Sequence, residues 1–147
     1  MSASLRRIWL RPNTGSPVRE VQEATAAVKA GLAEDHARAG KREVTVLSLE
    51  AWERACADLD AELCPSLRRA NLLVSGVDLA ETRGQRLRIG SVLLEIGGET
   101  KPCKLMEETH PGLWDALKPE WRGGVYAKVL EGGALQPGDA VELISAS

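Results

Sequence analysis

The sequence predicts a mostly β protein: a closed or nearly closed antiparallel β-barrel with a few peripheral helices. Strand-like segments outnumber helical ones by about eight to two, and most of them are short and bounded by glycine turns. Closure leaves no strand edge exposed, which favours a barrel for so many short strands. The 147 residues fit one domain, 1–147, because no Pro- or Ser-rich linker divides them.

The N-terminal third is read as strands joined by loops. Residues 11–17 are rich in turn formers, and the polar stretch Gly31–Lys41 is expected to be a long loop. The intervening segment Ala24–Ala30 fits a strand or a helix equally well. Apolar runs and polar–apolar alternation predict three strands, at Leu5–Leu10, Val18–Gln22 and Val44–Leu47.

One longer helix follows the third of these strands. Ser48 is a suitable N-cap residue, because its side-chain oxygen can accept a hydrogen bond from a backbone N–H of the first turn. Apolar residues then recur at helical spacing, which predicts one buried helix face. We expect the helix to end at or just before Pro65. The apolar positions are Leu49, Trp52, Cys56, Leu59 and Leu63.

The rest of the chain returns to strands. Pro111 can begin a short helix through Leu117, and Gly123-Gly124 would end that region. The segment from Gly84 to Leu93 resembles the segment from Gly132 to Val141. In each, a short apolar stretch and a glycine turn precede an expected core strand. Strands are expected at Asn71–Ser75, Leu87–Ile89, Val92–Ile96, Val125–Glu131 and Ala140–Ile144.

Composition limits the classes of function. Hydrophobic residues make up 44% and charged residues 27%, as in soluble globular proteins. The net charge of −2 gives no basic surplus, so a nucleic-acid partner is not expected. No apolar run approaches the ~20 residues of a membrane helix, and the first residues lack the apolar core of a signal peptide. We therefore expect a cytoplasmic protein with no membrane attachment.

Cys103 is the residue with the clearest chemical potential. It follows Pro102 just beyond a predicted strand and lies between Lys101 and Lys104. Neighbouring cations stabilise a thiolate, which can act as a nucleophile, a sulfur carrier or a soft-metal ligand. On spacing alone, an ordinary loop cysteine is an equally good interpretation. The other two cysteines, Cys56 and Cys64, are read as structural, and the three form no CxxC pair.

Two further segments could bind an anion. Arg68 and Arg69 lead into the strand that begins at Asn71, and guanidinium groups suit phosphate or carboxylate. Arg122 precedes two glycines whose backbone N–H groups could approach an anion. Solvated charges and a plain turn are the alternatives. In the polar loop, Asp35-His36 could be a base and its orienting partner, or simply surface.

The familiar nucleotide-binding and hydrolase signatures are absent from the sequence. Taken together, however, a set of ordered segments resembles the MOSC domain, the C-terminal domain of molybdenum cofactor sulfurase, from about Leu5 to Ile144. The strand Asn71–Ser75 with Gly76, followed by the Pro102-Cys103 loop, is the most specific part. The other matching segments are Gly31–His36, Arg42–Leu47, Leu87–Ile96, Pro111–Leu113, Arg122–Val125, Leu130–Gly133 and Pro137–Val141.

The resemblance implies a β-rich barrel with a signature cysteine that matches Cys103. In relatives that carry the molybdenum cofactor this cysteine ligates molybdenum, and in others it has been proposed to carry sulfur. Relatives include the mitochondrial amidoxime-reducing proteins and small bacterial proteins that reduce N-hydroxylated bases. The chain lacks the N-terminal barrel extension of the larger reductases, a pyridoxal-phosphate-dependent desulfurase domain, and a flavin or iron–sulfur site.

The cofactor that the resemblance implies would need several kinds of contact. Molybdenum with dithiolene sulfurs prefers a soft ligand, which Cys103 would supply as both metal ligand and catalytic residue. The pterin ends in a phosphate, which requires cations or backbone N–H groups. Asn71 could bond the pterin or a metal-bound oxygen. The phosphate contacts are expected from Arg69, Lys101, Lys104, Arg122, Gly123 and Gly124.

Three functions remain open at this point. The chain could be a molybdenum-cofactor oxidoreductase, or its cofactor-binding component, that reduces N-hydroxylated compounds with electrons from a separate donor protein. It could instead carry a persulfide on Cys103 and deliver sulfur to a partner. It could also be a non-catalytic barrel that binds a small ligand. The sequence does not separate the first two, because both require one accessible thiolate.

Overall fold

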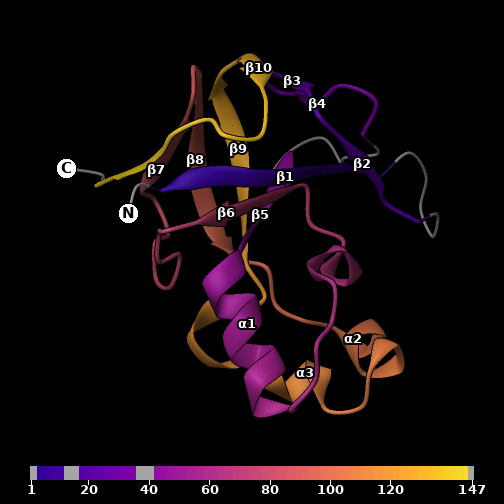
Figure 1. The fold of residues 1–147 in the computed structure, drawn as a ribbon. Helices are drawn as coiled ribbons and strands as arrows, with labels where there is room; N and C mark the ends of the chain where they lie inside the picture. The colour runs from indigo at the N-terminus through magenta and orange to yellow at the C-terminus, as the bar shows by residue number, and fades with distance from the viewer. Residues whose placement is uncertain (1–2, 12–16, 36–41, 146–147) are drawn as a thin grey trace.

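The computed structural model describes residues 3–11, 17–35 and 42–145. Two sheets and a group of helices form the molecule (Figure 1). The larger sheet has eight strands in the order β11-β7-β8-β9-β5-β6-β1-β2, and the smaller has the order β10-β3-β4. The strands of the larger sheet are β1 Ser4–Leu10, β2 Arg19–Val21, β5 Val44–Ser48, β6 Leu72–Ser75, β7 Arg86–Ile89, β8 Val92–Glu99, β9 Val125–Glu131 and β11 Val141–Ile144.

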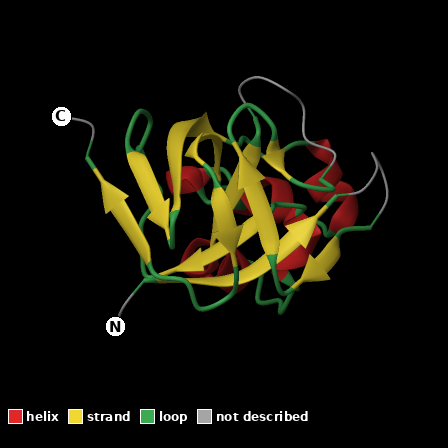
Figure 2. Ribbon diagram, turned by 90° about the horizontal axis from the view of Figure 1, so that it is seen from above, coloured by secondary structure: helices red, strands yellow, loops and turns green. Residues whose placement is uncertain are grey.

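Short elements complete the architecture. The helices gather on one side of the larger sheet, behind the strands in the second view (Figures 1 and 2). The three α-helices are α1 Leu49–Asp58, α2 Lys104–Thr109 and α3 Leu113–Ala116, and the two 3₁₀ turns are η1 Pro65–Arg68 and η2 Pro119–Trp121. The smaller sheet consists of β3 Ala24–Ala27, β4 Gly31–Leu32 and β10 Gly133–Leu135.

The central strands are buried on both faces. In β1, Ile8 lies in the core between the sheets, whereas Trp9 lies in the core under the helices. Likewise in β5, Val46 lies in the core between the sheets and Leu47 lies in the core under the helices. Successive side chains of a strand point to opposite faces, so strands that read as continuous apolar runs are covered on both sides. The helices therefore bury the outer face of the sheet next to the site described below.

The mostly β fold with few helices is confirmed, but the expected closed or nearly closed antiparallel barrel is confirmed only in part. The larger sheet is not closed, since β11 and β2 stand at its two ends. The segment before β11 approaches β1, the neighbour of β2, through an isolated bridge between Ser4 and Ala140 and a few backbone hydrogen bonds, such as that from Leu5 N to Asp139 O at 2.8 Å. The sheet is also mixed, because β5 and β6 run parallel. A helix connects these two strands, and such a crossover returns the chain in the same direction.

Most predicted strands are present, with shifted ends. The ambiguous segment 24–30 contains β3, whose buried and exposed residues alternate. Part of the expected loop 31–41 forms β4, while residues 36–41 lie outside the described residues, as do residues 12–16 of the first loop. β8 continues past Ile96 through two glycines, because the ring of Tyr126 packs where a side chain of Gly97 would stand.

The main helix begins as predicted but ends early. Ser48 Oγ accepts a hydrogen bond from Ala51 N at 3.2 Å, which confirms the N-cap. α1 ends at Asp58, because Asp60 takes a left-handed conformation with φ 50°. The chain then turns back, and Trp52 Nε1 donates to Leu63 O at 2.8 Å. Leu63 thus packs against the helix core without belonging to the helix.

The second helical region also differs from the expectation. The predicted helix Pro111–Leu117 is reduced to α3, which begins at Leu113 because Gly112 has a φ of 87°. α2, directly after Cys103, was not predicted. The two segments that resemble each other each hold a glycine turn between strands, at Gly90 and Gly138, although β10 and β11 belong to different sheets.

Candidate functional site

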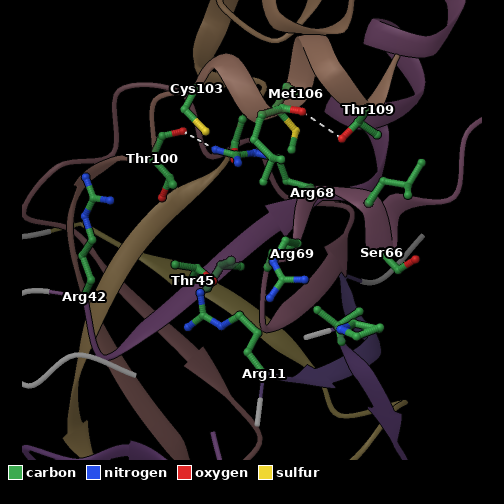
Figure 3. Close-up of a pocket in the computed structure, with 17 residues that line it drawn as sticks. Arg11, Arg42, Thr45, Ser66, Arg68, Arg69, Thr100, Cys103, Met106 and Thr109 are labelled. Atoms are coloured by element: carbon green, nitrogen blue, oxygen red, sulfur yellow. Dashed lines mark hydrogen bonds between the residues drawn. The ribbon is translucent and has the colours of Figure 1, made fainter. Parts of the chain in front are cut away.

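A cavity of about 1020 Å³ opens where β5, η1, the end of β8 and α2 meet (Figure 3). Four arginines and no carboxylate are found among the described residues that line it. An empty space lined in this way attracts anions. The described lining consists of Arg11, Pro17, Val18, Arg42, Thr45, Val46, Ser66, Leu67, Arg68, Arg69, Ala70, Thr100, Cys103, Leu105, Met106, Thr109 and Gly123.

Cys103 stands at the N-terminus of α2 with its thiol exposed on the cavity. The side chain makes no capping hydrogen bond to α2, so the sulfur is not used by the helix. Lys101 and Lys104 are exposed on either side and are not among the described residues that line the cavity. The expected accessible sulfur is therefore present, but the nearest cations in the cavity come from elsewhere.

The loop that carries Cys103 is held from three sides. Thr100 N donates to Gly124 O at 2.8 Å, and Trp114 Nε1 donates to Pro102 O at 3.2 Å. Arg68 joins the third side, since its Nη2 donates to Thr100 O at 2.9 Å while its Nε donates to Gly123 O at 2.9 Å. Backbone carbonyls on two segments are thus fixed by one guanidinium, which positions the cysteine loop against the glycine turn.

Arg68 is a buried charge that the sequence suggested only as half of an anion-binding pair. Burial lowers the pKa of Arg68 below its usual range, and the charge of Arg42 lowers that pKa further, whereas Cys103 and Glu99 raise it. A guanidinium nevertheless stays protonated in proteins. The carbonyls of Thr100 and Gly123 accept hydrogen bonds from two of its N–H groups, and its charge lies within electrostatic reach of Cys103.

Gly123 and Gly124 are required by close approach. A Cβ on Gly123 would lie 2.7 Å from Thr100 O, and one on Gly124 would lie 2.4 Å from Val46 O. Gly124 also has a φ of 99°, a conformation that side chains rarely adopt. Of the two, Gly123 lines the cavity. Both glycines therefore let the turn before β9 pack tightly against β5 and the cysteine loop.

Arg69 lines the cavity at the end of η1, where it adopts a left-handed conformation with φ 64°. Such a conformation costs a non-glycine residue roughly 1–2 kcal/mol, so the surrounding structure must hold it. In Figure 3 the guanidinium of Arg69 lies between Arg11 and the end of the cavity where Cys103 and Thr100 stand. The Cys103 sulfur therefore lies at one end of the cavity, and the guanidinium groups of Arg69 and Arg11 lie toward the other end.

Asn71 lies behind the cavity wall rather than in it. Its side chain is fully buried, with Oδ1 accepting from Thr45 N at 3.0 Å and from Arg11 Nη2 at 3.2 Å. Its Nδ2 donates to Trp9 O at 3.2 Å. Asn71 therefore joins β1, β5 and β6 below the arginines.

Arg11 links this amide to Asp35, a residue of the predicted base and orienter pair. The Arg11 guanidinium donates to both carboxylate oxygens of Asp35, at 3.3 and 3.1 Å, and the Asp35 side chain has 0% exposure. His36, the other member of the pair, lies outside the described residues. The charge of Arg11 is thus matched by a buried carboxylate.

Arg122 occupies a different place from the expected phosphate contacts. It is buried between helices, where Nη1 donates to Asp58 Oδ2 at 2.6 Å and to Ala116 O at 3.1 Å. Arg122 and Gly124 are not among the described residues that line the cavity. Arg122 therefore ties α1 and α3 to the segment that precedes the glycine turn.

Among the expected site residues, the structure brings Cys103, Arg69 and Gly123 together in the cavity. Sequence reasoning did not assign Arg11, Arg42 or Thr100 to the site. Arg11 directly follows a predicted strand, Arg42 lies just before another, and Thr100 follows β8, which runs past its predicted end, so a correct sheet order would have placed them close together. The hydroxyl of Thr100 is buried and has no hydrogen-bond partner within the part of the chain that the structure describes.

A family model described as the MOSC domain matches residues 33–142. The chain belongs to the MOSC domain family. The match includes the cysteine loop, Arg42, Arg68, Arg69 and the glycine turn. A comparison with curated proteins found no match.

Solved structures of similar fold support the architecture. The YuaD protein from Bacillus subtilis superposes with a TM-score of 0.83 at 18% identity, covering 100% of this chain and 98% of that one. YiiM from Geobacillus stearothermophilus gives 0.77 at 16% identity, covering 97% and 75% of the two chains. YiiM from Escherichia coli gives 0.71 at 17% identity, covering 98% and 71%. At these identities the likeness extends to the fold alone.

No helix in the described part of this MOSC domain is long and apolar enough to cross a membrane. Nor do the described residues contain a group of three or more His, Cys, Asp or Glu side chains that could hold a metal ion.

Proposed function

We propose that this MOSC domain binds the molybdenum cofactor, with the Cys103 sulfur as a ligand of molybdenum and the arginine-lined end of the cavity holding the pterin phosphate. The observation that carries the proposal is one cavity with an exposed cysteine sulfur, four arginines and no carboxylate among its described lining. A dithiolene-bound metal requires a soft ligand, and a phosphate requires guanidinium groups.

The residues present fit such a group. Arg69 and Arg11 lie at the end of the cavity away from Cys103, which suits an elongated ligand with a metal at one end and a phosphate at the other (Figure 3). Thr100 adds, close to the cysteine loop, a buried hydroxyl that no described residue hydrogen-bonds. In this proposal Lys101 and Lys104 contribute charge at the cavity mouth, while Asn71, Arg122 and Gly124 support the walls.

When bound, the cofactor supplies two-electron redox chemistry, and the protein supplies binding and orientation. Arg68 would keep the Cys103 loop fixed and place a positive charge within electrostatic reach of the sulfur. The proposed reaction is the reduction of N-hydroxylated compounds in the cytoplasm, with electrons from a separate donor protein.

Metal content tests the proposal. The wild-type chain should be expressed in a host that makes the cofactor, and bound molybdenum and pterin should be measured beside the variants Cys103→Ser and Cys64→Ser. Cys64 is a matched control, because it is also exposed but lies outside the cavity lining. We expect metal in the wild type and in Cys64→Ser, and a loss of at least tenfold in Cys103→Ser.

Other outcomes would contradict the proposal. Equal molybdenum in wild type and Cys103→Ser would remove Cys103 from the ligand set. Protein without metal that gains the mass of one sulfur on Cys103 would instead support a sulfur carrier with a sulfur-donor partner. An absence of both would leave a non-catalytic binding domain.

A further inference from the structure

We propose that Arg42 makes the cavity selective for small molecules that carry a negative charge, so that the substrate approaching Cys103 is an anion such as a carboxylate. The inference deepens the proposed function, because it names the class of substrate for the same cavity. It concerns a residue that the cofactor's phosphate does not require, since Arg69 and Arg11 lie elsewhere in the cavity (Figure 3).

The four cavity arginines differ in how their charges are matched. Arg11 pairs with Asp35, whose carboxylate has 0% exposure. Arg68 is buried against two carbonyl oxygens. Arg69 has partners of its own. Arg42 differs from Arg11 and Arg68, because it is exposed and no carboxylate among the described residues lies within ion-pair distance of it.

Arg42 is nevertheless held in place. Its guanidinium carbon lies 5.2 Å from the centre of the Tyr126 ring, a distance typical of a cation–π contact. Tyr126 is paired with Thr45 of β5 and with Gly98 of β8, so the ring belongs to the rigid part of the sheet. A guanidinium stacked in this way presents its N–H donors at its edge with little loss of side-chain entropy on binding.

The carboxylates nearest to Arg42 along the chain and across the sheet do not neutralise the cavity. Glu43 is buried, and its Oε1 accepts from Val129 N at 2.8 Å. Glu99 attracts Arg68, yet among the described residues it forms no ion pair and does not line the cavity. Arg42 and Arg68 repel each other, and an anion between Cys103 and Arg42 would relieve that repulsion.

The alkylation of Cys103 by two reagents tests this inference without any cofactor. Iodoacetate and iodoacetamide both react by attack of the thiolate sulfur on carbon, which forms an S–C bond, breaks the C–I bond and releases iodide. The reagents differ in charge, and both consume the same thiolate. The ratio of their rates at Cys103 therefore reports the preference for an anion and is independent of the ionised fraction of the thiol.

The rates should be measured at fixed pH on the full chain by mass spectrometry of the Cys103 peptide. We expect the ratio of iodoacetate to iodoacetamide to fall by about two- to fivefold in Arg42→Gln, because a unit charge several ångströms away contributes that much in a wet cavity. The same fall should appear in the wild type when salt is raised to 1 M. Arg83→Gln, an exposed arginine that donates to Gly97 O outside the cavity, should leave the ratio unchanged.

Two results would overturn the inference. The first is an equal ratio in wild type and Arg42→Gln. The second is a fall of the rate ratio in Arg69→Gln with no fall in Arg42→Gln, which would assign the selectivity to the end of the cavity that holds Arg69 and Arg11. Circular dichroism of each variant separates either result from misfolding. Because this test uses the metal-free protein, it fails or succeeds independently of the molybdenum measurement.

Discussion

At the scale of single residues, the three cysteines differ in a way that spacing alone did not reveal. Cys56 is buried in the helix core, as predicted for a small hydrophobic residue. Cys103 is exposed on the cavity, and Cys64 is exposed outside it. The sequence indicated Cys103 as a reactive cysteine because two lysines lie within two residues of it along the chain. The partners of Cys64 depend on a turn and on a distant strand, so no local pattern could show them.

We expect the pKa of the Cys64 thiol to lie below its ordinary value. The Ser66 hydroxyl donates to Cys64 Sγ at 3.1 Å and lowers the pKa of this thiol below its ordinary value of 9.0, against a smaller opposing effect of burial. Arg7 adds a further small lowering. We expect the iodoacetamide reaction of the Cys64 peptide to reach half its maximal rate below pH 9.0, and Ser66→Ala to move that midpoint upward.

The same linkage predicts a stability effect. A folded-state pKa below the unfolded value stabilises the native state above the unfolded pKa, and this contribution is lost as pH falls through the folded pKa. Ser66→Ala should therefore destabilise the protein more at pH 10 than at pH 7. An unchanged alkylation midpoint in Ser66→Ala would show that the hydroxyl does not stabilise the thiolate.

At the scale of elements, the main helix shows why the start of an element can be easier to predict than its end. The start of α1 follows from Ser48, a local signal that acts within one turn. Its end depends on the left-handed turn at Asp60 and on the bond from Trp52 to Leu63 O, which are tertiary features. α2 was missed because its single buried residue, Met106, gives no periodic pattern over so few positions.

The Ser48 cap should contribute measurably to stability. Ser48→Ala removes the acceptor for Ala51 N in a buried setting, so we expect the free energy of unfolding to fall by about 1 kcal/mol. Urea denaturation followed by circular dichroism measures the change. Ser145→Ala, at an exposed position after β11, is the matched control and should change stability by less than about 0.5 kcal/mol. Equal effects of the two substitutions would argue against a role for the cap.

At the scale of the whole molecule, the individual strands were largely predicted but their arrangement was not. Alternating apolar residues indicate that a strand has a buried face, and they do not say which strand lies beside it. The parallel pairing of β5 with β6 could have been inferred, since the sequence placed a helix between two strands. The cavity escaped sequence analysis for the same reason: Arg42, Arg69 and Thr100 come together only through the sheet order.

An open sheet predicts uneven protection of backbone amides. β5 lies between β9 and β6 and is buried along its whole length, whereas β2 stands at one end of the sheet and is largely exposed. Hydrogen exchange followed by mass spectrometry should show the amides of β2 exchanging at least tenfold faster than those of β5. Similar protection in both strands would indicate that a further strand covers β2 in solution and that the sheet is effectively closed.

The bridge between Ser4 and Ala140 has a consequence for the order in which the chain can fold. Leu5 N donates to Asp139 O and Gly138 N donates to Leu5 O, so the start of β1 completes its contacts with residues that lie far along the chain. A ribosome adds residues one after another from the N-terminus, and long-range pairings of this kind form slowly. The first residues of β1 therefore stay paired with β6 alone until the segment around Asp139 has been made, whereas its last residues can already pair with β2.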